Sequence, residues 1–183
     1  MTMMRAEKSV LVLVDYQSRL MPAIHEASHV AGIAQLLGQV ARLLGIPVLG
    51  TEQNPDKLGP NLEQVKAGCD RTLAKTHFDA CKDGLLGALD DAKPGCEQIV
   101  IAGCEAHVCM MQTALGLLES GKRVWVVANA SGSRHPGDHA AAMSRLAHAG
   151  ATIVTHEMVM FEWLGDCRQA RFREVLELIK ASA

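Results

Sequence analysis

The strongest constraint on the fold is the alternation of short, continuous apolar runs with amphipathic stretches along the whole chain. The apolar runs predict strands at 9–15, 46–51, 98–103, 123–128 and 151–155, with a weaker candidate at 71–76. The stronger runs are apolar at consecutive positions, as in SVLVLVD, and do not alternate with polar residues. This pattern is typical of parallel strands that are covered on both faces.

Between these runs lie stretches with helical periodicity. They predict helices at 28–44, 83–92, 108–120, 138–149, 157–164 and 168–181. Gly45, Gly121 and Gly150 stand where C-cap glycines are expected, and Asp138 is predicted to be a helix N-cap. Strand and helix alternate, so we expect a parallel sheet with helices on both faces. The turn-rich stretch 52–61 is predicted to be a loop over a site.

Composition narrows the possible functions. A chain of 183 residues is expected to form one domain over 1–183. Its net charge of −2, with no stripe of Lys and Arg, argues against a nucleic-acid partner. No apolar stretch approaches the roughly 20 residues of a membrane span, and the N-terminus lacks a signal-peptide core. We therefore expect a cytoplasmic protein whose six cysteines are free thiols.

Three chemically distinct side chains are predicted at the carboxyl edge of the sheet. This edge matters because ligands bind at the carboxyl ends of parallel strands. Asp15 ends the run 9–15, Lys75 ends the weak strand, and Cys109 starts the helix after 98–103. Singly they are explained by a capping carboxylate, a solvated lysine and an inert buried thiol. Together they supply a base, a positive charge and a nucleophile. A helix start is expected to lower the pKa of the Cys109 thiol.

Metal binding is the rival interpretation of the stretch AGCEAHVC. Cys104, His107 and Cys109 do not have the paired C-x2-C spacing of a zinc site. His135 and His139 are four residues apart, but Pro136 and Gly137 lie between them and favour a helix-entry loop. We therefore expect no metal and no other cofactor.

The motifs LVLVDYQ, AKTHFDA and AGCEAHVCMMQTA, in this order, resemble those of the isochorismatase-like cysteine hydrolases. TEQNPDKLGP, NASGSR and FREVLELIKASA are similar to the isochorismatase-domain-containing subgroup. The resemblance implies a Rossmann-like six-stranded parallel sheet in the order 3-2-1-4-5-6. It implies a catalytic triad of Asp15, Lys75 and Cys109. It also implies a cis peptide between Cys104 and Glu105, which aims the Glu105 N–H, with that of Cys109, at an oxyanion.

Departures from the family pattern refine the expected activity. The stretch TEQNPDKLGP contains no histidine, so the metal site of nicotinamidases is not expected. Isochorismatases that act on a vinyl ether use the aspartate without the cysteine, whereas Cys109 is present here. The leading hypothesis is therefore a hydrolase of a small amide or related C–N bond that forms a thioester on Cys109.

Three other hypotheses remain open: a binding or scaffold protein that keeps the fold, a vinyl-ether hydrolase, and a redox thiol that forms a Cys104–Cys109 disulfide. Weaker candidates for lining the pocket are Gln17, Glu52, His77, Phe78 and His107. Trp125 is predicted to be a core residue. The apolar side chains within 138–164 favour a homo-oligomer, and the expected ligand is a small molecule.

Overall fold

The computed structural model describes residues 3–181. The strands are β1 (Ser9–Val14), β2 (Val48–Gln53), β3 (Arg71–Lys75), β4 (Gln98–Gly103), β5 (Arg123–Val127) and β6 (Thr152–Val154). They form one parallel sheet in the order β3-β2-β1-β4-β5-β6. The predicted fold class and strand order are confirmed, and the weak candidate at 71–76 is the edge strand β3.

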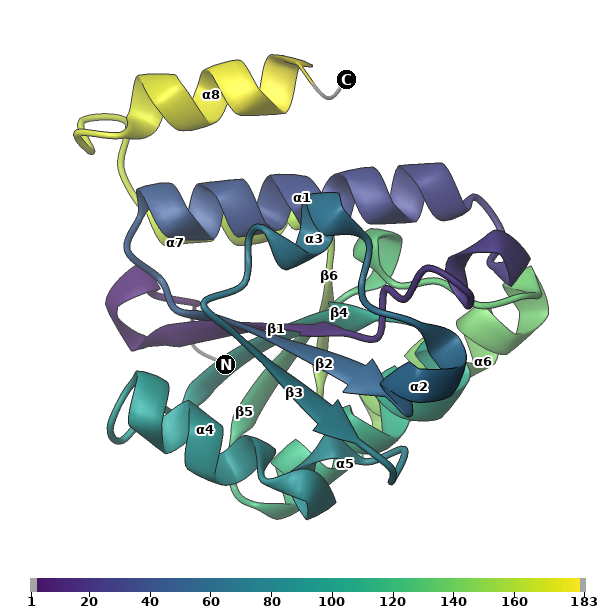
Figure 1. Cartoon of the computed structure of the whole chain (residues 1–183). Coiled ribbons are helices and arrows are strands. Elements are labelled where there is room, and N and C mark those ends of the chain that lie inside the picture. The colour runs from purple at the N-terminus through teal and green to yellow at the C-terminus, as the bar shows by residue number, and fades with distance from the viewer. Residues whose placement is uncertain (1–2, 182–183) are drawn as a thin grey trace.

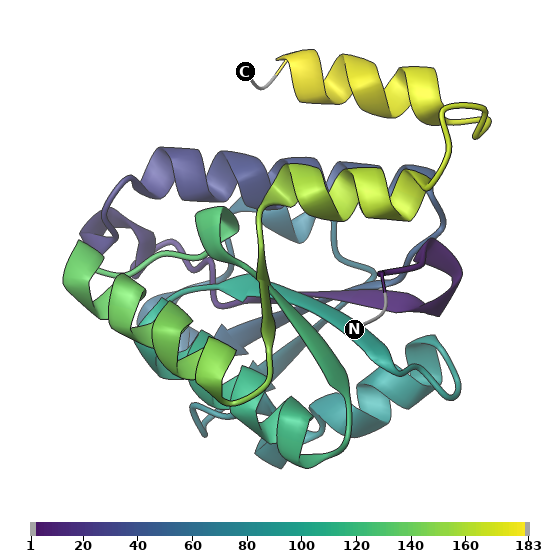
Figure 2. The same ribbon diagram turned by 180° about the vertical axis from the view of Figure 1, so that it is seen from behind.

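Helices cover both faces of the sheet (Figures 1 and 2). On one face lie α1 (Ala27–Leu43), α3 (Glu63–Lys66) and α7 (His156–Leu164), with α8 (Phe172–Ala181) outermost. On the other face lie α4 (Leu85–Ala92), α5 (Met111–Glu119) and α6 (Pro136–His148). The short helix α2 (Pro55–Leu58) sits at the carboxyl edge, within the stretch predicted to be a loop.

Strand β1 explains why the apolar runs are continuous. Leu11 and Leu13 pack in the core under α1 and α7, whereas Val10, Val12 and Val14 pack in the core over α4, α5 and α6. Every residue of β1 is buried, so each of its two faces must be apolar. A half-exposed strand would instead have shown alternation.

Several helix boundaries differ from the predictions; α8, for example, begins at Phe172 and not at residue 168. α6 begins at Pro136 with His135 at the N-cap, so the prediction that Asp138 caps this helix is wrong. Proline fits the first helical position because its fixed φ suits the helix and its missing N–H is not needed there. The predicted helix 108–120 is instead a π-helical turn, Ala106–Met110, followed by α5.

Other predictions about the helices and the core hold. Gly45, Gly121 and Gly150 have positive φ angles directly after the C-caps of α1, α5 and α6. Trp125 is buried in the core. In the described part of the chain no helix combines the length and the apolar character needed to traverse a bilayer.

Gly103 shows how closely the two central strands approach each other. It pairs with Val14, and a Cβ atom at Gly103 would lie 2.4 Å from the Val14 carbonyl oxygen and 2.5 Å from the Val14 Cβ. Both strands are buried, so neither backbone has room to move away. Only glycine fits at this position.

We predict that Gly103→Ala lowers the free energy of unfolding by roughly 1–3 kcal/mol or more, because it overpacks a buried backbone contact. Urea unfolding followed by circular dichroism measures this change. Gly87→Ala on α4 is the control, since its Cβ would meet nothing within 4 Å; alanine should stabilise that helix by about 0.5–1 kcal/mol. Equal stability of Gly103→Ala and the wild type would contradict the prediction.

Candidate active site

A buried ion pair lies at the carboxyl edge of the sheet. Asp15 directly follows β1, and Lys75 is the last residue of β3, two strands away. The Lys75 Nζ lies 2.7 Å from Oδ2 of Asp15, and both side chains are completely buried. Asp15 has a φ of +55°, a left-handed conformation that aspartate tolerates better than most residues.

The two oxygens of the Asp15 carboxylate have different surroundings. Oδ1 accepts a hydrogen bond of 2.6 Å from the Thr51 hydroxyl at the end of β2. Oδ2 is in ionic contact with Lys75 but accepts no well-directed hydrogen bond from any residue of 3–181. A buried oxygen in that state has a lone pair available for a proton.

Gln53, the last residue of β2, is a further partner of Lys75. Its Oε1 accepts a hydrogen bond of 2.7 Å from the Lys75 Nζ, and its Nε2 donates one of 2.7 Å to the Thr76 carbonyl. If the amide of Gln53 were turned over, its NH2 group would face the Lys75 ammonium and its oxygen would face the Thr76 carbonyl. The hydrogen-bond network therefore determines the orientation of this amide. The carbonyl oxygens of His77 and Phe78 lie 3.4 Å from the same ammonium group.

The sequence pattern places Thr51 at a strand end near the site but does not indicate Gln53 as a site residue. The apolar pattern ends at 51, which puts Gln53 in the predicted loop 52–61. In the structure β2 continues to Gln53, which is in register with Lys75 of β3. The predicted run 46–51 already has the usual strand length of about 5–6 residues, so strand length gave no signal for Gln53.

Cys109 meets this network from the other side. It lies in the π-helical turn Ala106–Met110, and its Sγ is 3.9 Å from Oε1 of Gln53. The same Gln53 oxygen binds the Lys75 ammonium that pairs with Asp15, so the three predicted residues lie in one buried cluster. π-helical turns often occur at functional sites because they reposition side chains relative to a regular helix.

The thiol is not activated in the way that its helix-start position suggested. Burial raises the pKa of the Cys109 thiol to about 12, and the Asp15 carboxylate adds to the rise; Lys75 opposes it. The prediction of a lowered pKa is therefore wrong. Desolvation and a neighbouring carboxylate both disfavour the thiolate and outweigh the dipole of a short helical turn.

The turn before Cys109 begins with a cis peptide bond between Cys104 and Glu105. The Glu105 carboxylate accepts a hydrogen bond of 2.9 Å from the Arg134 Nε. The Ala106 N–H donates to the Gly132 carbonyl at 2.7 Å, which anchors the turn to the segment after β5.

Two of the weaker candidates, Gln17 and Glu52, have structural contacts. Gln17 is buried. Its side-chain amide accepts a hydrogen bond from the Gln53 N–H and donates one to the Gln53 carbonyl. The Glu52 carboxylate accepts the Asn61 N–H at 2.8 Å. Both therefore hold the end of β2 in place.

The other weaker candidates lie nearer the surface. Phe78 is 50% exposed, and the side chain of His77 is 57% exposed and pairs with Asp83. The Nδ1 of His107 lies 3.0 Å from the Ser133 hydroxyl. These three residues flank the elements that carry Lys75 and Cys109.

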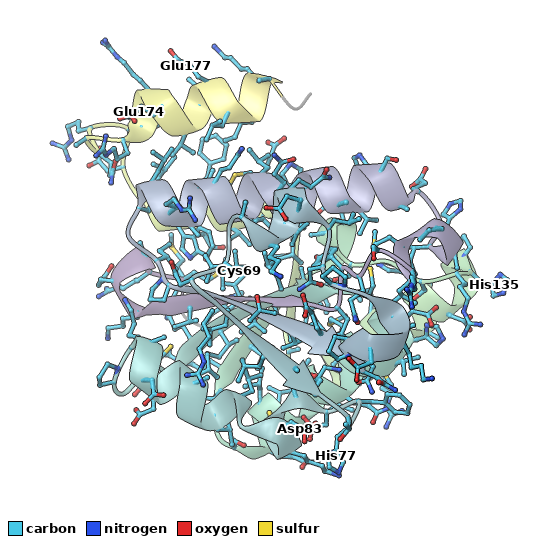
Figure 3. The ribbon with its side chains drawn as sticks, viewed as in Figure 1. Cys69, His77, Asp83, His135, Glu174 and Glu177 are labelled. Carbon is cyan, nitrogen blue, oxygen red and sulfur yellow. The ribbon has the colours of Figure 1, made fainter. Side chains whose placement is uncertain are left out.

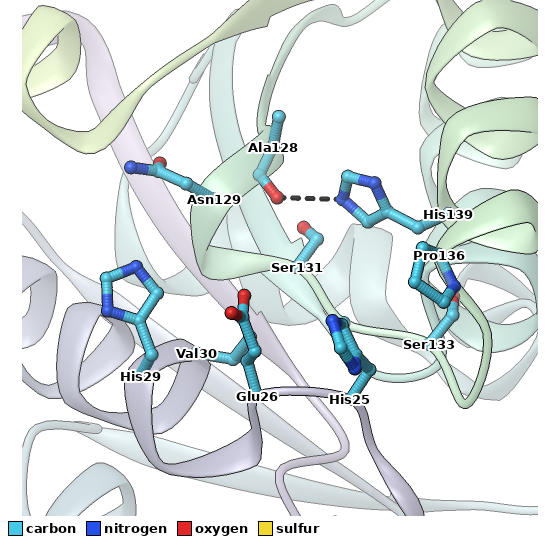
Figure 4. A pocket seen from close by; sticks show the side chains of 11 residues that line it. His25, Glu26, His29, Val30, Ala128, Asn129, Ser131, Ser133, Pro136 and His139 are labelled. Atoms are coloured by element: carbon cyan, nitrogen blue, oxygen red, sulfur yellow. Dashed lines mark hydrogen bonds between the residues drawn. The ribbon is translucent and has the colours of Figure 1, made fainter.

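A separate cavity of about 290 Å³ opens between the start of α1 and the segment after β5 (Figure 4). It is lined by His25, His29, Asn129, Ser131 and His139, among others. The Nε2 of His139 lies 2.9 Å from the Ala128 carbonyl, so this nitrogen carries the proton. None of the residues of the Asp15–Lys75–Cys109 cluster lines this cavity. In the part of the chain that the structure describes, no group of three or more His, Cys, Asp or Glu side chains is placed to hold a metal ion.

The fold and this cluster define a doubly wound parallel α/β protein with a buried polar site at the carboxyl edge of its sheet. Residues 9–158 match the Isochorismatase domain family. The chain therefore belongs to the isochorismatase family, in the isochorismatase-domain-containing subgroup.

Individual relatives agree with this assignment. Isochorismatase domain-containing protein 1 of Danio rerio is 38% identical over 176 residues, which cover 96% of this chain and 62% of that relative's length. The MAR1 ribonuclease structure from Caenorhabditis elegans has a TM-score of 0.92 at 30% identity, covering 98% of this chain and 93% of its own. The YcaC gene product of Escherichia coli, described as an octameric hydrolase of unknown specificity, shares the fold, with a TM-score of 0.87 at 23% identity over 99% and 96% of the two chains.

We predict that iodoacetamide at pH 8 labels the exposed Cys167 before Cys109, which is 6% exposed. The thiolate reacts, and below its pKa the thiolate fraction of Cys109 rises about tenfold per pH unit. The labelling rate of Cys109 should therefore climb through pH 8–10 without a plateau, as peptide mass spectrometry would show. Preferential labelling of Cys109 at pH 7 would mean that its pKa is not raised.

We predict that Lys75→Met lowers the free energy of unfolding by about 3–5 kcal/mol, because Asp15 is left buried without its counter-charge. Replacing both charges in Asp15→Asn/Lys75→Met should restore part of this loss. Urea unfolding of the two variants measures the difference. A single variant as stable as the double variant would show that the ion pair is not the cause.

Proposed function

We propose that this chain hydrolyses a small amide or related C–N bond through a thioester on Cys109. The observation that carries the proposal is that one oxygen of Gln53 lies 3.9 Å from the Cys109 sulfur and 2.7 Å from the ammonium of the buried Asp15–Lys75 pair. In this pair, the Asp15 carboxylate can accept a proton, and the Lys75 ammonium supplies a positive charge near the sulfur. A nucleophile, a base and an electrostatic stabiliser are the parts that covalent acyl transfer needs.

In the first half of the reaction, Oδ2 of Asp15 takes the thiol proton as Sγ attacks the substrate carbonyl carbon. The backbone N–H groups of Glu105 and Cys109 hold the oxyanion that forms. The tetrahedral intermediate then breaks its C–N bond, and Asp15 returns the proton to the leaving amine. The enzyme is left as a thioester, with Asp15 again a carboxylate.

In the second half, Asp15 takes a proton from a water molecule whose oxygen attacks the thioester carbonyl. Collapse of this intermediate breaks the C–S bond and releases a carboxylic acid, and the proton on Asp15 returns to the sulfur. Lys75 stays an ammonium group throughout, and its charge favours the thiolate form of Cys109.

The raised pKa of Cys109 supports a base-assisted mechanism. A thiol that is protonated at neutral pH is a weak nucleophile until its proton is removed. The Oδ2 of Asp15 is in ionic contact with Lys75 but accepts no well-directed hydrogen bond, so we propose that it removes that proton as the bond to carbon forms. We also favour this chemistry over vinyl-ether hydrolysis, which would leave Cys109 without a role.

We propose a small molecule as the substrate and a homo-oligomer as the assembly. The nucleophile is 6% exposed, and a net charge of −2 does not favour a polyanionic ligand. On α7, Met158 is 48% exposed and Phe161 is 43% exposed, so this helix presents two large apolar side chains to water. Contact with a second copy would remove both from water.

We predict that Cys109→Ala abolishes ammonia release from a panel of small amides while leaving the thermal unfolding midpoint within a few degrees of the wild type. Cys167→Ala is the control and should keep full activity, because Cys167 is exposed. For each amide that is hydrolysed, intact-mass spectrometry should detect an acyl adduct on wild-type protein that is absent from Cys109→Ala. Turnover by Cys109→Ala at the wild-type rate would refute the thioester mechanism.

A further inference from the structure

The segment from Thr76 to Asp83 carries backbone groups that surround the Lys75 ammonium. The carbonyls of His77 and Phe78 each lie 3.4 Å from Nζ, and the carbonyl of Thr76 holds the amide of Gln53, the other acceptor of this ammonium. These oxygens belong to a loop, so something must keep the loop in the required shape. We propose that Asp83 is a positioning residue for Lys75 that acts through this loop.

Both carboxylate oxygens of Asp83 form hydrogen bonds with residues at the start of this loop. Oδ2 accepts the backbone N–H groups of Thr76 and His77, each at 2.8 Å, and Oδ1 lies 2.9 Å from the Nδ1 of His77. Figure 3 shows His77 and Asp83 side by side near the end of β3. The N–H groups that Asp83 binds directly follow Lys75, so the carboxylate sets the path of the chain as it leaves the strand.

Thr113 on α5 anchors the middle of the same loop. Its hydroxyl donates to the Phe78 carbonyl at 3.3 Å and accepts the Ala80 N–H at 3.1 Å. Thr113 is fully buried, and its helix directly follows the turn that carries Cys109. The loop therefore links the lysine to the helix of the nucleophile, with Asp83 at one end and Thr113 in the middle.

The backbone hydrogen bonds give Asp83 this role, more than its ion pair with His77. The His77 side chain is 57% exposed, and water and salt weaken exposed pairs. The N–H bonds to Asp83 are direct and fix two consecutive peptide groups. The His77 contact, together with these N–H donors, also keeps the pKa of Asp83 below its usual value, so the carboxylate stays charged at neutral pH.

This role rests on the proposed place of Lys75 beside Cys109, but it can be tested without a substrate. Lys75 favours the thiolate, so a displaced lysine raises the pKa of Cys109 and slows its alkylation. The measurement is the iodoacetamide rate constant of Cys109 at pH 9, followed by peptide mass spectrometry in the full-length protein. Failure of the thioester mechanism would leave this rate unaffected.

Asp83→Leu removes the acceptors, and Asp83→Asn keeps an oxygen for the two N–H groups. We expect Asp83→Leu to slow labelling of Cys109 about three- to tenfold, which corresponds to roughly half to one pKa unit. Asp83→Asn should restore most of the wild-type rate. The matched control is Asp90→Leu, because Asp90 is also a surface aspartate that binds a backbone N–H, that of Gly95, far from Lys75. It should leave the rate unchanged.

A double-mutant cycle separates this effect from a change in access to the sulfur. If Asp83 acts through Lys75, adding Asp83→Leu to Lys75→Met should produce no further slowing. The proposal is overturned if Asp83→Leu labels at the wild-type rate, or if it changes the rate equally in both backgrounds. Should Lys75→Met not fold, the comparison of Asp83→Leu with Asp83→Asn decides, and equal rates for these two variants would also overturn the proposal.

Discussion

The contact between Asp15 and Lys75 is the interaction on which the rest of the site depends. Two opposite charges with no solvent exposure are tolerated only when each is paired and hydrogen-bonded. The pair joins β1 to β3 across the end of β2. The polar groups at that end must therefore supply the remaining hydrogen bonds of the two charged groups. Thr51 binds the carboxylate and Gln53 binds the ammonium, and Gln17 in turn holds the backbone of Gln53.

The same pair determines the state of Cys109. The carboxylate raises the pKa of the thiol and the ammonium lowers it, so the charges of a balanced pair largely oppose each other at the sulfur. Burial then has the largest effect on the pKa of Cys109, and it favours the neutral thiol. The Cys109 thiol therefore stays protonated at neutral pH. The exposed Cys167 has no such protection from bulk reagents.

The fold could be predicted from the sequence because its central strands are buried on both faces. Consecutive apolar residues in β1 and β4 show this directly, and the short links between strands and helices leave few topologies. The chemistry-bearing positions Asp15, Lys75 and Cys109 could also be selected, since each stands at a strand or helix boundary. Gln53 could not, because it extends a strand beyond its last apolar residue and its role depends on pairing with Lys75.

The pKa of Cys109 could not be predicted from sequence for a related reason. Position at a helix start is a local property, and its effect on a thiol is modest and confined to the first turn. Desolvation depends on what the rest of the chain packs around the sulfur, and here that includes the Asp15 carboxylate from a strand more than ninety residues away in the sequence. When tertiary burial and a local dipole act on one group in opposite directions, burial prevails because it removes water from the charged form altogether.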